Sequence, residues 1–268
     1  MSELHASGKL ILDRPAEAVA RIRICNPPKR GALDHEILDG LAELVPSLDR
    51  GIDTRCLVVT GTERMFSSGY DIGDIPEEVF AQEAERLVAQ PFSRAIEAVE
   101  RFSFPTLAAI NGHALGGGLE LALSCDLRVA ASEAKLGMPP AKLGLIYSHT
   151  GLHKFIDTIG AARTREMFFV GRNVPAPRAE QFGLVNEVFA GDQLESKSIE
   201  LAAEIATNAP LSLKGNKRII NSLISFARLS EQQQQELIDL RLSSFASDDF
   251  REGVSAFGQK RKAIWRGR

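Results

Sequence analysis

Two short stretches of the chain place small residues beside an acid, each at the end of an apolar segment. The stretch NGHALGGGLELALSCD (111–126) has three consecutive glycines before Glu120, and RMFSSGYDIGDIP (64–76) has the run SSG before Asp71. Glycine permits positive φ and a close ligand approach, and a helix start leaves N–H groups without intrahelical partners. Two such turns can offer converging donors to a negative oxygen, so the pair predicts an oxyanion hole. A tight turn without chemistry is the alternative for the glycine triplet alone.

Alternating strands and helices are expected to position these turns. Strand-like apolar runs occupy 18–26, 55–62, 106–110 and 126–132, and helical spacing occupies 33–48, 84–102 and 119–125. Asp34 is a candidate N-cap of the first helix, and Pro91 lies inside the second. Strands that alternate with helices are typical of an α/β fold.

The last third of the chain has a different character. From about residue 191 onward nearly every segment has helical spacing, over 195–210, 211–229, 231–247 and 248–265. The run EQQQQE (231–236) is expected to continue a helix. We therefore predict an α/β core over residues 1–195 and a helical C-terminal region over residues 196–268.

Composition and charge exclude several classes of protein. The chain has 32 Lys plus Arg against 35 Asp plus Glu, which argues against a dedicated nucleic-acid binder. No apolar run approaches about 20 residues, so no membrane span is expected. The N-terminal stretch lacks a basic start followed by an apolar segment, so no secretory signal is expected. Cys25, Cys56 and Cys125 have no metal-type spacing, which favours reduced thiols in a cytoplasmic protein.

Four segments, in this order and spacing, resemble the crotonase superfamily of acyl-CoA enzymes, the enoyl-CoA hydratase/isomerase-like proteins. They are NPPKRGALD (26–34), FSSGYDI (66–72), INGHALGGGLELALSCDLRVAASEAKLGMP (110–139) and AEQFGLVNEV (179–188). The resemblance covers roughly residues 10–262. It implies a spiral core of ββα units, a helical C-terminal region that builds trimers or dimers of trimers, and an extended groove for a CoA thioester. It also implies that the backbone N–H groups of Tyr70 and Gly117 stabilise an enolate-like oxygen.

The common reactions of that superfamily each lack a catalytic group here. Hydratases use two glutamates around a water; Glu120 matches the first, and Pro140 stands at the position of the second. Isomerases place a carboxylate at the position of Ser148. A structural carboxylate that satisfies N–H groups is the alternative for Glu120.

The methylmalonyl-CoA decarboxylase branch is the most similar. Residues 138–160 and 245–262 resemble that branch, which has a tyrosine at the position of Tyr147. A decarboxylase needs no strong base, because loss of CO2 generates the enolate. The histidine that this branch can carry is Tyr70 here, and a core aromatic is the alternative for Tyr147. A hydratase or isomerase of altered mechanism and a non-catalytic acyl-CoA-binding protein stay open.

The remaining site candidates are residues expected to contact the substrate. They are Arg30, Ser67, Ser68, Gly69, Asp71, Ile72, Met138, Phe257 and Lys260. The resemblance implies that Phe257 and Lys260 lie near the adenine of a neighbouring subunit's CoA, whereas an ordinary trimer interface is the alternative. Arg30 is assigned to a CoA phosphate or to the solvated surface. His149 and His153 lie four residues apart without a third ligand at useful spacing, so no metal is predicted. Coenzyme A is expected only as part of the substrate, with no separate cofactor.

Overall fold

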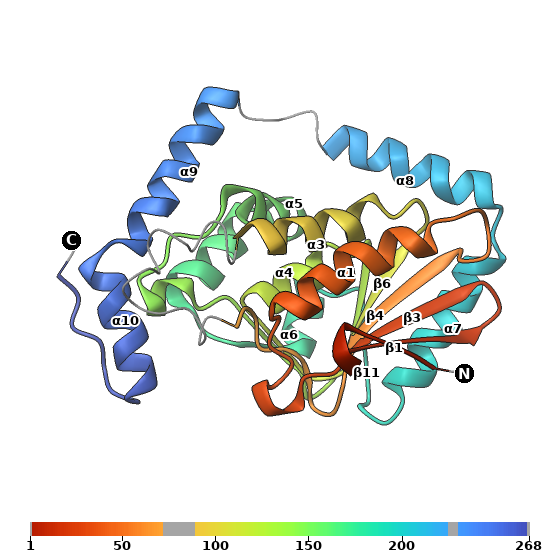
Figure 1. Cartoon of the computed structure of the whole chain (residues 1–268), viewed down its shortest axis with the longest axis horizontal. Coiled ribbons are helices and arrows are strands. Elements are labelled where there is room, and N and C mark those ends of the chain that lie inside the picture. Colours follow the sequence, from red (N-terminus) through yellow and green to blue (C-terminus); the bar gives the residue numbers. More distant parts are fainter. Residues whose placement is uncertain (1, 72–88, 225–229, 267–268) are drawn as a thin grey trace.

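The computed structural model describes residues 2–71, 89–224 and 230–266 as two sheets surrounded by helices (Figure 1). The larger sheet has seven strands. Their order is β1 (Glu3–His5), β2 (Leu10–Ala16), β3 (Val19–Ile24), β4 (Cys56–Gly61), β6 (Thr106–Ile110), β8 (Leu127–Ala131) and β11 (Glu187–Phe189). The pairs β1–β2 and β2–β3 are antiparallel, and every pair from β3 onward is parallel. The predicted strands over 18–26, 55–62, 106–110 and 126–132 are confirmed.

A smaller sheet lies beyond the ends of these strands and carries the predicted turns. Its order is β10 (Val174–Pro175), β9 (Lys135–Gly137), β7 (His113–Leu115) and β5 (Met65–Ser67). The chain passes from β4 to β5, from β6 to β7 and from β8 to β9, so each turn of the spiral gives one strand to each sheet. The repeated passage between two sheets confirms the predicted spiral α/β fold.

Helices α1 (His35–Leu48) and α3 (Gln90–Arg101) run side by side (Figure 1). The Asp34 side chain accepts a hydrogen bond from the Ile37 N–H at 3.0 Å, so the predicted N-cap is confirmed. Pro91 is the second described residue of α3, and residues 84–88 of the predicted helical segment lie outside the described residues. The first turn of a helix tolerates proline, because N–H groups there have no intrahelical acceptor.

Two further helices, α4 and α5, carry residues of the candidate active site. Helix α4 (Gly117–Leu123) follows β7 directly and is buried along its whole length. Helix α5 (His149–Arg165) packs against α4 and contains a non-helical residue, Gly160. The short α6 (Ala176–Gln181) follows β10.

The C-terminal region is helical, as predicted. Helix α7 (Leu194–Thr207) packs on β4 and β6, and α8 (Pro210–Ile224), α9 (Glu231–Phe245) and α10 (Asp248–Gly258) follow. The EQQQQE run is helical, as predicted, and opens α9 behind a Ser230 capping box. Helix α10 ends at Gly258, short of the predicted 265, because Arg261 and Ile264 turn back to bond Glu252. The division of the chain near residue 195 stays a prediction.

Apolar side chains from both sheets and from α1, α3, α4 and α7 form one core. Cys56 and Cys125 are buried in it as free thiols, and burial raises the pKa of each thiol to about 12. Cys25 is half-buried and also free. Within residues 2–71, 89–224 and 230–266, no helix has the length and hydropathy needed to cross a membrane.

Candidate active site

The two turns predicted from the sequence meet in the structure, because β5 and β7 are parallel neighbours. Gly69 has a φ of 100°, and a Cβ built on it would lie 3.3 Å from the Gly117 nitrogen. A Cβ on Gly118 would lie 2.6 Å from the Ser67 Cβ, so a side chain there would force the turns apart. Glycine is therefore required at both positions for the close approach of the turns.

Two backbone N–H groups project from this junction. Gly117 is the first residue of α4, and no residue that the structure describes accepts a hydrogen bond from its N–H. On the other turn, the Leu33 N–H donates to the Gly69 carbonyl, and the Asp71 N–H donates to the Leu33 carbonyl. N–H groups alternate sides along an extended chain, so the Tyr70 N–H points away from Leu33. The geometry is compatible with two donors at one edge of the site.

Glu120 lies on the first turn of α4 and is only 3% exposed. The Tyr147 hydroxyl donates to its Oε2 at 2.5 Å. The Lys154 ammonium, from α5, lies 3.6 Å from its Oε1. Gly151 leaves room for this arrangement, since a Cβ there would lie 2.6 Å from Tyr147 Cε1 and 2.9 Å from Glu120 Oε2. The two helices thus enclose a single carboxylate between a phenol and an ammonium group.

The environment shifts the pKa values of these groups. Burial raises the pKa of Glu120, although the Lys154 charge and the Tyr147 hydrogen bond oppose the shift. Burial and then the Glu120 charge raise the pKa of Tyr147 well above its usual range. Burial and then the Arg241 charge lower the pKa of His149. The phenol therefore stays protonated near neutral pH, and Glu120 has a stronger tendency to hold a proton than an exposed glutamate.

Both positions where related reactions would place a second carboxylate have structural roles. Pro140 is buried and opens a short 3-10 helix, Pro140–Leu143. Ser148 is the N-cap of α5, and its hydroxyl accepts from the Gly151 N–H at 3.1 Å. Neither side chain has a carboxyl group that could act beside Glu120.

The candidates around the first turn hold its backbone in place. Ser67 is buried, and its hydroxyl accepts from the Gly69 N–H at 3.1 Å. The Ser68 hydroxyl donates to the Lys29 carbonyl at 3.1 Å, and the Lys29 ammonium pairs with Asp71 at 2.5 Å. These bonds tie the turn to the loop after β3.

The remaining predicted substrate contacts differ in their exposure to solvent. Arg30 is exposed and has a φ of 54°, and its carbonyl accepts from the Ser68 N–H. Phe257 is 74% exposed on α10, and Lys260 is exposed just beyond that helix. Their predicted roles involve CoA and a neighbouring subunit and stay predictions. Met138 is fully buried. Ile72 lies outside the described residues.

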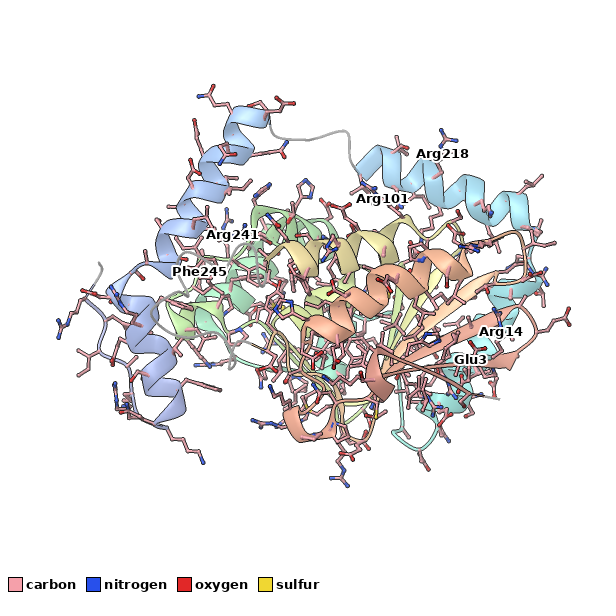
Figure 2. The ribbon with its side chains drawn as sticks, in the orientation of Figure 1. Glu3, Arg14, Arg101, Arg218, Arg241 and Phe245 are labelled. Carbon is pink, nitrogen blue, oxygen red and sulfur yellow. The ribbon has the colours of Figure 1, made fainter. Side chains whose placement is uncertain are left out.

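Sequence reasoning missed three charged residues near the site, namely Lys154, Glu100 and Arg241. Besides its contact with Glu120, Lys154 pairs with Glu100 of α3, at 3.1 Å. Arg241 lies where α9 faces α5, close enough for its charge to act on Tyr147 and His149 (Figure 2). Helical spacing contained one signal: Lys154 follows Gly151 by three residues, on the side of α5 that meets the core. The sequence offered no comparable signal for the other two.

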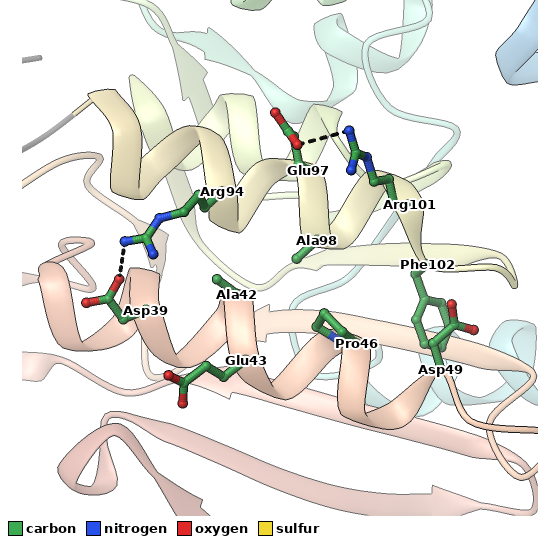
Figure 3. A pocket seen from close by; sticks show the side chains of 10 residues that line it. All are labelled: Asp39, Ala42, Glu43, Pro46, Asp49, Arg94, Glu97, Ala98, Arg101 and Phe102. Carbon is green, nitrogen blue, oxygen red and sulfur yellow. Dashed lines mark hydrogen bonds and ion pairs between the residues drawn. The ribbon is translucent and has the colours of Figure 1, made fainter. Parts of the chain in front are cut away.

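A groove of about 660 Å³ lies elsewhere, between α1 and α3 (Figure 3). Two ion pairs lie in it, Arg94 with Asp39 at 2.8 Å and Glu97 with Arg101 at 3.2 Å. None of the predicted site residues lines it. We assign no chemistry to this groove, because the side chains of both ion pairs are exposed to solvent.

Comparison with known proteins decides the family. The family model described as enoyl-CoA hydratase/isomerase matches residues 14–268. The chain belongs to this family. It is therefore an acyl-CoA-processing enzyme of the crotonase superfamily, as the four sequence segments predicted.

The relatives of this family member are named for different reactions. The 2,3-dehydroadipyl-CoA hydratase of Escherichia coli is 31% identical over 260 residues, which cover 97% of this chain and 99% of that protein. The short-chain-enoyl-CoA hydratase of Clostridium acetobutylicum is 29% identical over 264 residues, which cover 94% of this chain and 95% of that protein. The structure of a methylmalonyl-CoA decarboxylase in complex with 2-nitronate-propionyl-CoA is similar with a TM-score of 0.88 and 26% identity, covering 97% and 99%.

Proposed function

We propose that this enzyme decarboxylates methylmalonyl-CoA or a similar malonyl-type thioester through an enolate held in an oxyanion hole. The observation that carries the proposal is one buried carboxylate, Glu120, hydrogen-bonded to the Tyr147 hydroxyl beside the paired turns. The structural similarity to a methylmalonyl-CoA decarboxylase supports it.

In this reaction the bond between the α-carbon and the carboxylate breaks, and CO2 leaves. The bonding electron pair passes to the thioester carbonyl oxygen, where the N–H groups of Gly117 and Tyr70 stabilise the negative charge. One proton then adds to the α-carbon, so the reaction consumes one proton and releases one CO2. Tyr147 holds the departing carboxylate out of the thioester plane. No cofactor is needed beyond the coenzyme A of the substrate.

Hydration is the second candidate, because sequence relatives are named as hydratases. Addition of water across a double bond needs one group to take a proton from water and a group to give one back. Glu120 is a single carboxylate, and positions 140 and 148 have no acid. A hydratase built on this site would therefore use one glutamate for both steps.

Two substrates distinguish these reactions. The protein is incubated with methylmalonyl-CoA and, separately, with crotonyl-CoA. Release of CO2 from the first supports the proposal, and hydration of the second supports the other candidate. Binding of either thioester without turnover would point to a non-catalytic acyl-CoA-binding protein.

Two variants test the roles within the site. Tyr147→Phe removes a hydrogen bond to a charged group, worth about 1.5–3 kcal/mol. Decarboxylation should fall about 10- to 150-fold, because 1.36 kcal/mol corresponds to a factor of ten in rate. Glu120→Gln keeps the shape of the side chain and should lower the rate of decarboxylation less than Tyr147→Phe does. The opposite order, with an inactive Glu120→Gln and a fully active Tyr147→Phe, would contradict decarboxylation.

We also propose that the enzyme forms a trimer or a dimer of trimers. Helix α8 buries only Lys217 among its described residues and exposes apolar side chains, namely Leu211, Ile219, Ile220, Leu223 and Ile224. An apolar surface of this kind is typical of a subunit interface. In such an assembly Phe257 and Lys260 would approach the adenine of a neighbouring subunit's CoA, and Arg30 a CoA phosphate. A light-scattering mass of a monomer, 29.2 kDa, at micromolar concentration would exclude the proposed trimer.

A further inference from the structure

Four polar side chains form a continuous series from the site toward the surface between α3 and α5. The Tyr147 hydroxyl bonds Glu120 at 2.5 Å, the Lys154 ammonium lies 3.6 Å from Glu120, and the same ammonium lies 3.1 Å from Glu100. The exposed fraction of the side chains rises along the series, from 4% for Glu120 to 18% for Lys154 and 37% for Glu100. The proposed decarboxylation assigns no role to the two outer members.

The hydrogen bond between Tyr147 and Glu120 can run in either direction. A phenol has one proton, and an ionised carboxylate can only accept. When Glu120 is ionised, Tyr147 must donate to it, and the phenol proton is occupied. When Glu120 is protonated, its own proton can bond the Tyr147 oxygen, which leaves the phenol proton for the substrate carboxylate. The ionisation of Glu120 thus decides whether Tyr147 can hold the group that leaves.

The charges that face this pair come from several elements. Lys154 of α5 faces Glu120 directly, and Glu100 of α3 competes for the same ammonium group. Around Tyr147, the charge of Arg241 on α9 and the hydroxyl of Tyr70 on the first turn also act on the phenol. Arg241 and Tyr70 thus act on the phenol, whereas Lys154 and Glu100 act on the carboxylate.

We propose that Lys154 is a positioning residue that favours the ionised form of Glu120. Glu100 weakens this effect because it pairs with the same ammonium group. The proposal deepens the decarboxylase assignment and rests on it. Decarboxylation is fast while Glu120 is protonated and declines on an alkaline limb where Glu120 ionises. Lys154 moves this limb to lower pH, because a nearby cation favours the carboxylate. Glu100 moves it back to higher pH.

Opposite shifts in two variants test the proposal. Lys154→Met removes the cation, so the alkaline limb of kcat should move to higher pH. Glu100→Gln releases Lys154 toward Glu120, so the limb should move to lower pH. Lys154→Arg keeps the charge and should restore a limb near that of the parent enzyme. Glu97→Gln is the matched control, since Glu97 lies one turn earlier on α3, pairs with Arg101 and should leave the limb in place.

A second readout needs no substrate. Carboxyl 13C signals of labelled glutamate are titrated by NMR, and the Glu120 signal is identified by its loss in Glu120→Gln. The pH at the midpoint of the Glu120 titration should be higher in Lys154→Met and lower in Glu100→Gln than in the parent enzyme. Midpoints that do not move in either variant would overturn the proposal, whatever the substrate. If the midpoints move as expected while methylmalonyl-CoA is not decarboxylated, the charge relation stands and the decarboxylase assignment fails.

Discussion

Gly151 separates the catalytic pair from the backbone of α5, and adding one methyl group there tests the arrangement. In Gly151→Ala the new Cβ would lie 2.6 Å from Tyr147 Cε1, 2.9 Å from Glu120 Oε2 and 2.9 Å from Ser148 Oγ. All three distances are below the ordinary van der Waals separation of carbon atoms, about 3.5–4.0 Å. Since the three atoms belong to different residues, the pair must move for the methyl group to fit.

The free energy of this change has two parts of opposite sign. Alanine inside a helix is more favourable than glycine by about 0.8–1.0 kcal/mol. Overpacking in a filled region costs about 1–3 kcal/mol. The net effect on the free energy of unfolding should therefore lie between about 0 and 2 kcal/mol of destabilisation. Turnover should fall further, about 10- to 150-fold, if the displaced Tyr147 hydroxyl loses its hydrogen bond of about 1.5–3 kcal/mol to the departing carboxylate.

Gly215→Ala on α8 is the matched control for this substitution. A Cβ on Gly215 has no heavy atom within 4 Å, so only the gain in helix propensity remains. Urea unfolding should place the Gly151→Ala midpoint below that of Gly215→Ala, and decarboxylation should fall only in Gly151→Ala. Equal stabilisation of both variants with undiminished turnover would refute the close contact inferred at Gly151.

Three further predictions address the oxyanion hole, the attachment of α8 and the buried thiols. Gly117→Pro deletes one N–H donor at a helix position that tolerates proline, so turnover should fall about 100- to 1000-fold, whereas Gly117→Ala, which keeps the N–H and brings a Cβ to 3.2 Å from the Tyr70 ring, should lose less. Undiminished turnover in a folded Gly117→Pro enzyme would reject this N–H as a donor. Lys217→Met leaves the buried Phe104 carbonyl without this donor and should lower the free energy of unfolding by about 1–3 kcal/mol in urea titrations, more than Lys214→Met does; losses of equal size would show that the Lys217 contacts add no more stability than those of Lys214. Ellman's reagent at pH 8 should leave Cys56 and Cys125 unmodified until the protein is denatured, because burial raises the pKa of both thiols to about 12; rapid modification of more than one thiol in the native protein, beyond the half-buried Cys25, would mean that this part of the core opens.

The Lys217 prediction follows from an anchor between α8 and the core. Its ammonium lies 2.7 Å from Asp126 Oδ2 and donates to the Phe104 carbonyl at 3.0 Å. Asp126 in turn accepts from the N–H and hydroxyl of Thr106. Lys214, by contrast, lies over the Phe104 ring at 4.4 Å and is less enclosed. The buried lysine is therefore the stronger attachment of α8.

Four strands of the larger sheet, β3, β4, β6 and β8, could be predicted closely, whereas β1, β2, β11 and the strands of the smaller sheet were not predicted. Segments such as 55–62 are continuous apolar runs and form the buried strand β4. By contrast, β5, β7 and β9 have three residues each. So short a strand shows no periodicity, and its place depends on pairing with a neighbour distant in sequence. Helix ends were predicted less closely than helix faces, as at the C-terminal end of α10, because apolar spacing marks a helix face better than its end.

The sequence by itself indicated the α/β class and the two turns, which depend on residue types at short spacing, where local backbone requirements act directly. The resemblance of four segments added the family and the spiral arrangement of the fold. It also placed Glu120 and Tyr147 as candidates and left Pro140 and Ser148 without an acid.

Only the tertiary structure decided which charges surround Glu120. Lys154 and Glu100 are 34 and 20 residues from it along the chain, and neither belongs to a short motif. Their approach depends on how α5 and α3 pack around α4, and such packing is set by the whole core rather than by any local pattern. The ionisation of the central carboxylate is therefore a property of the folded protein.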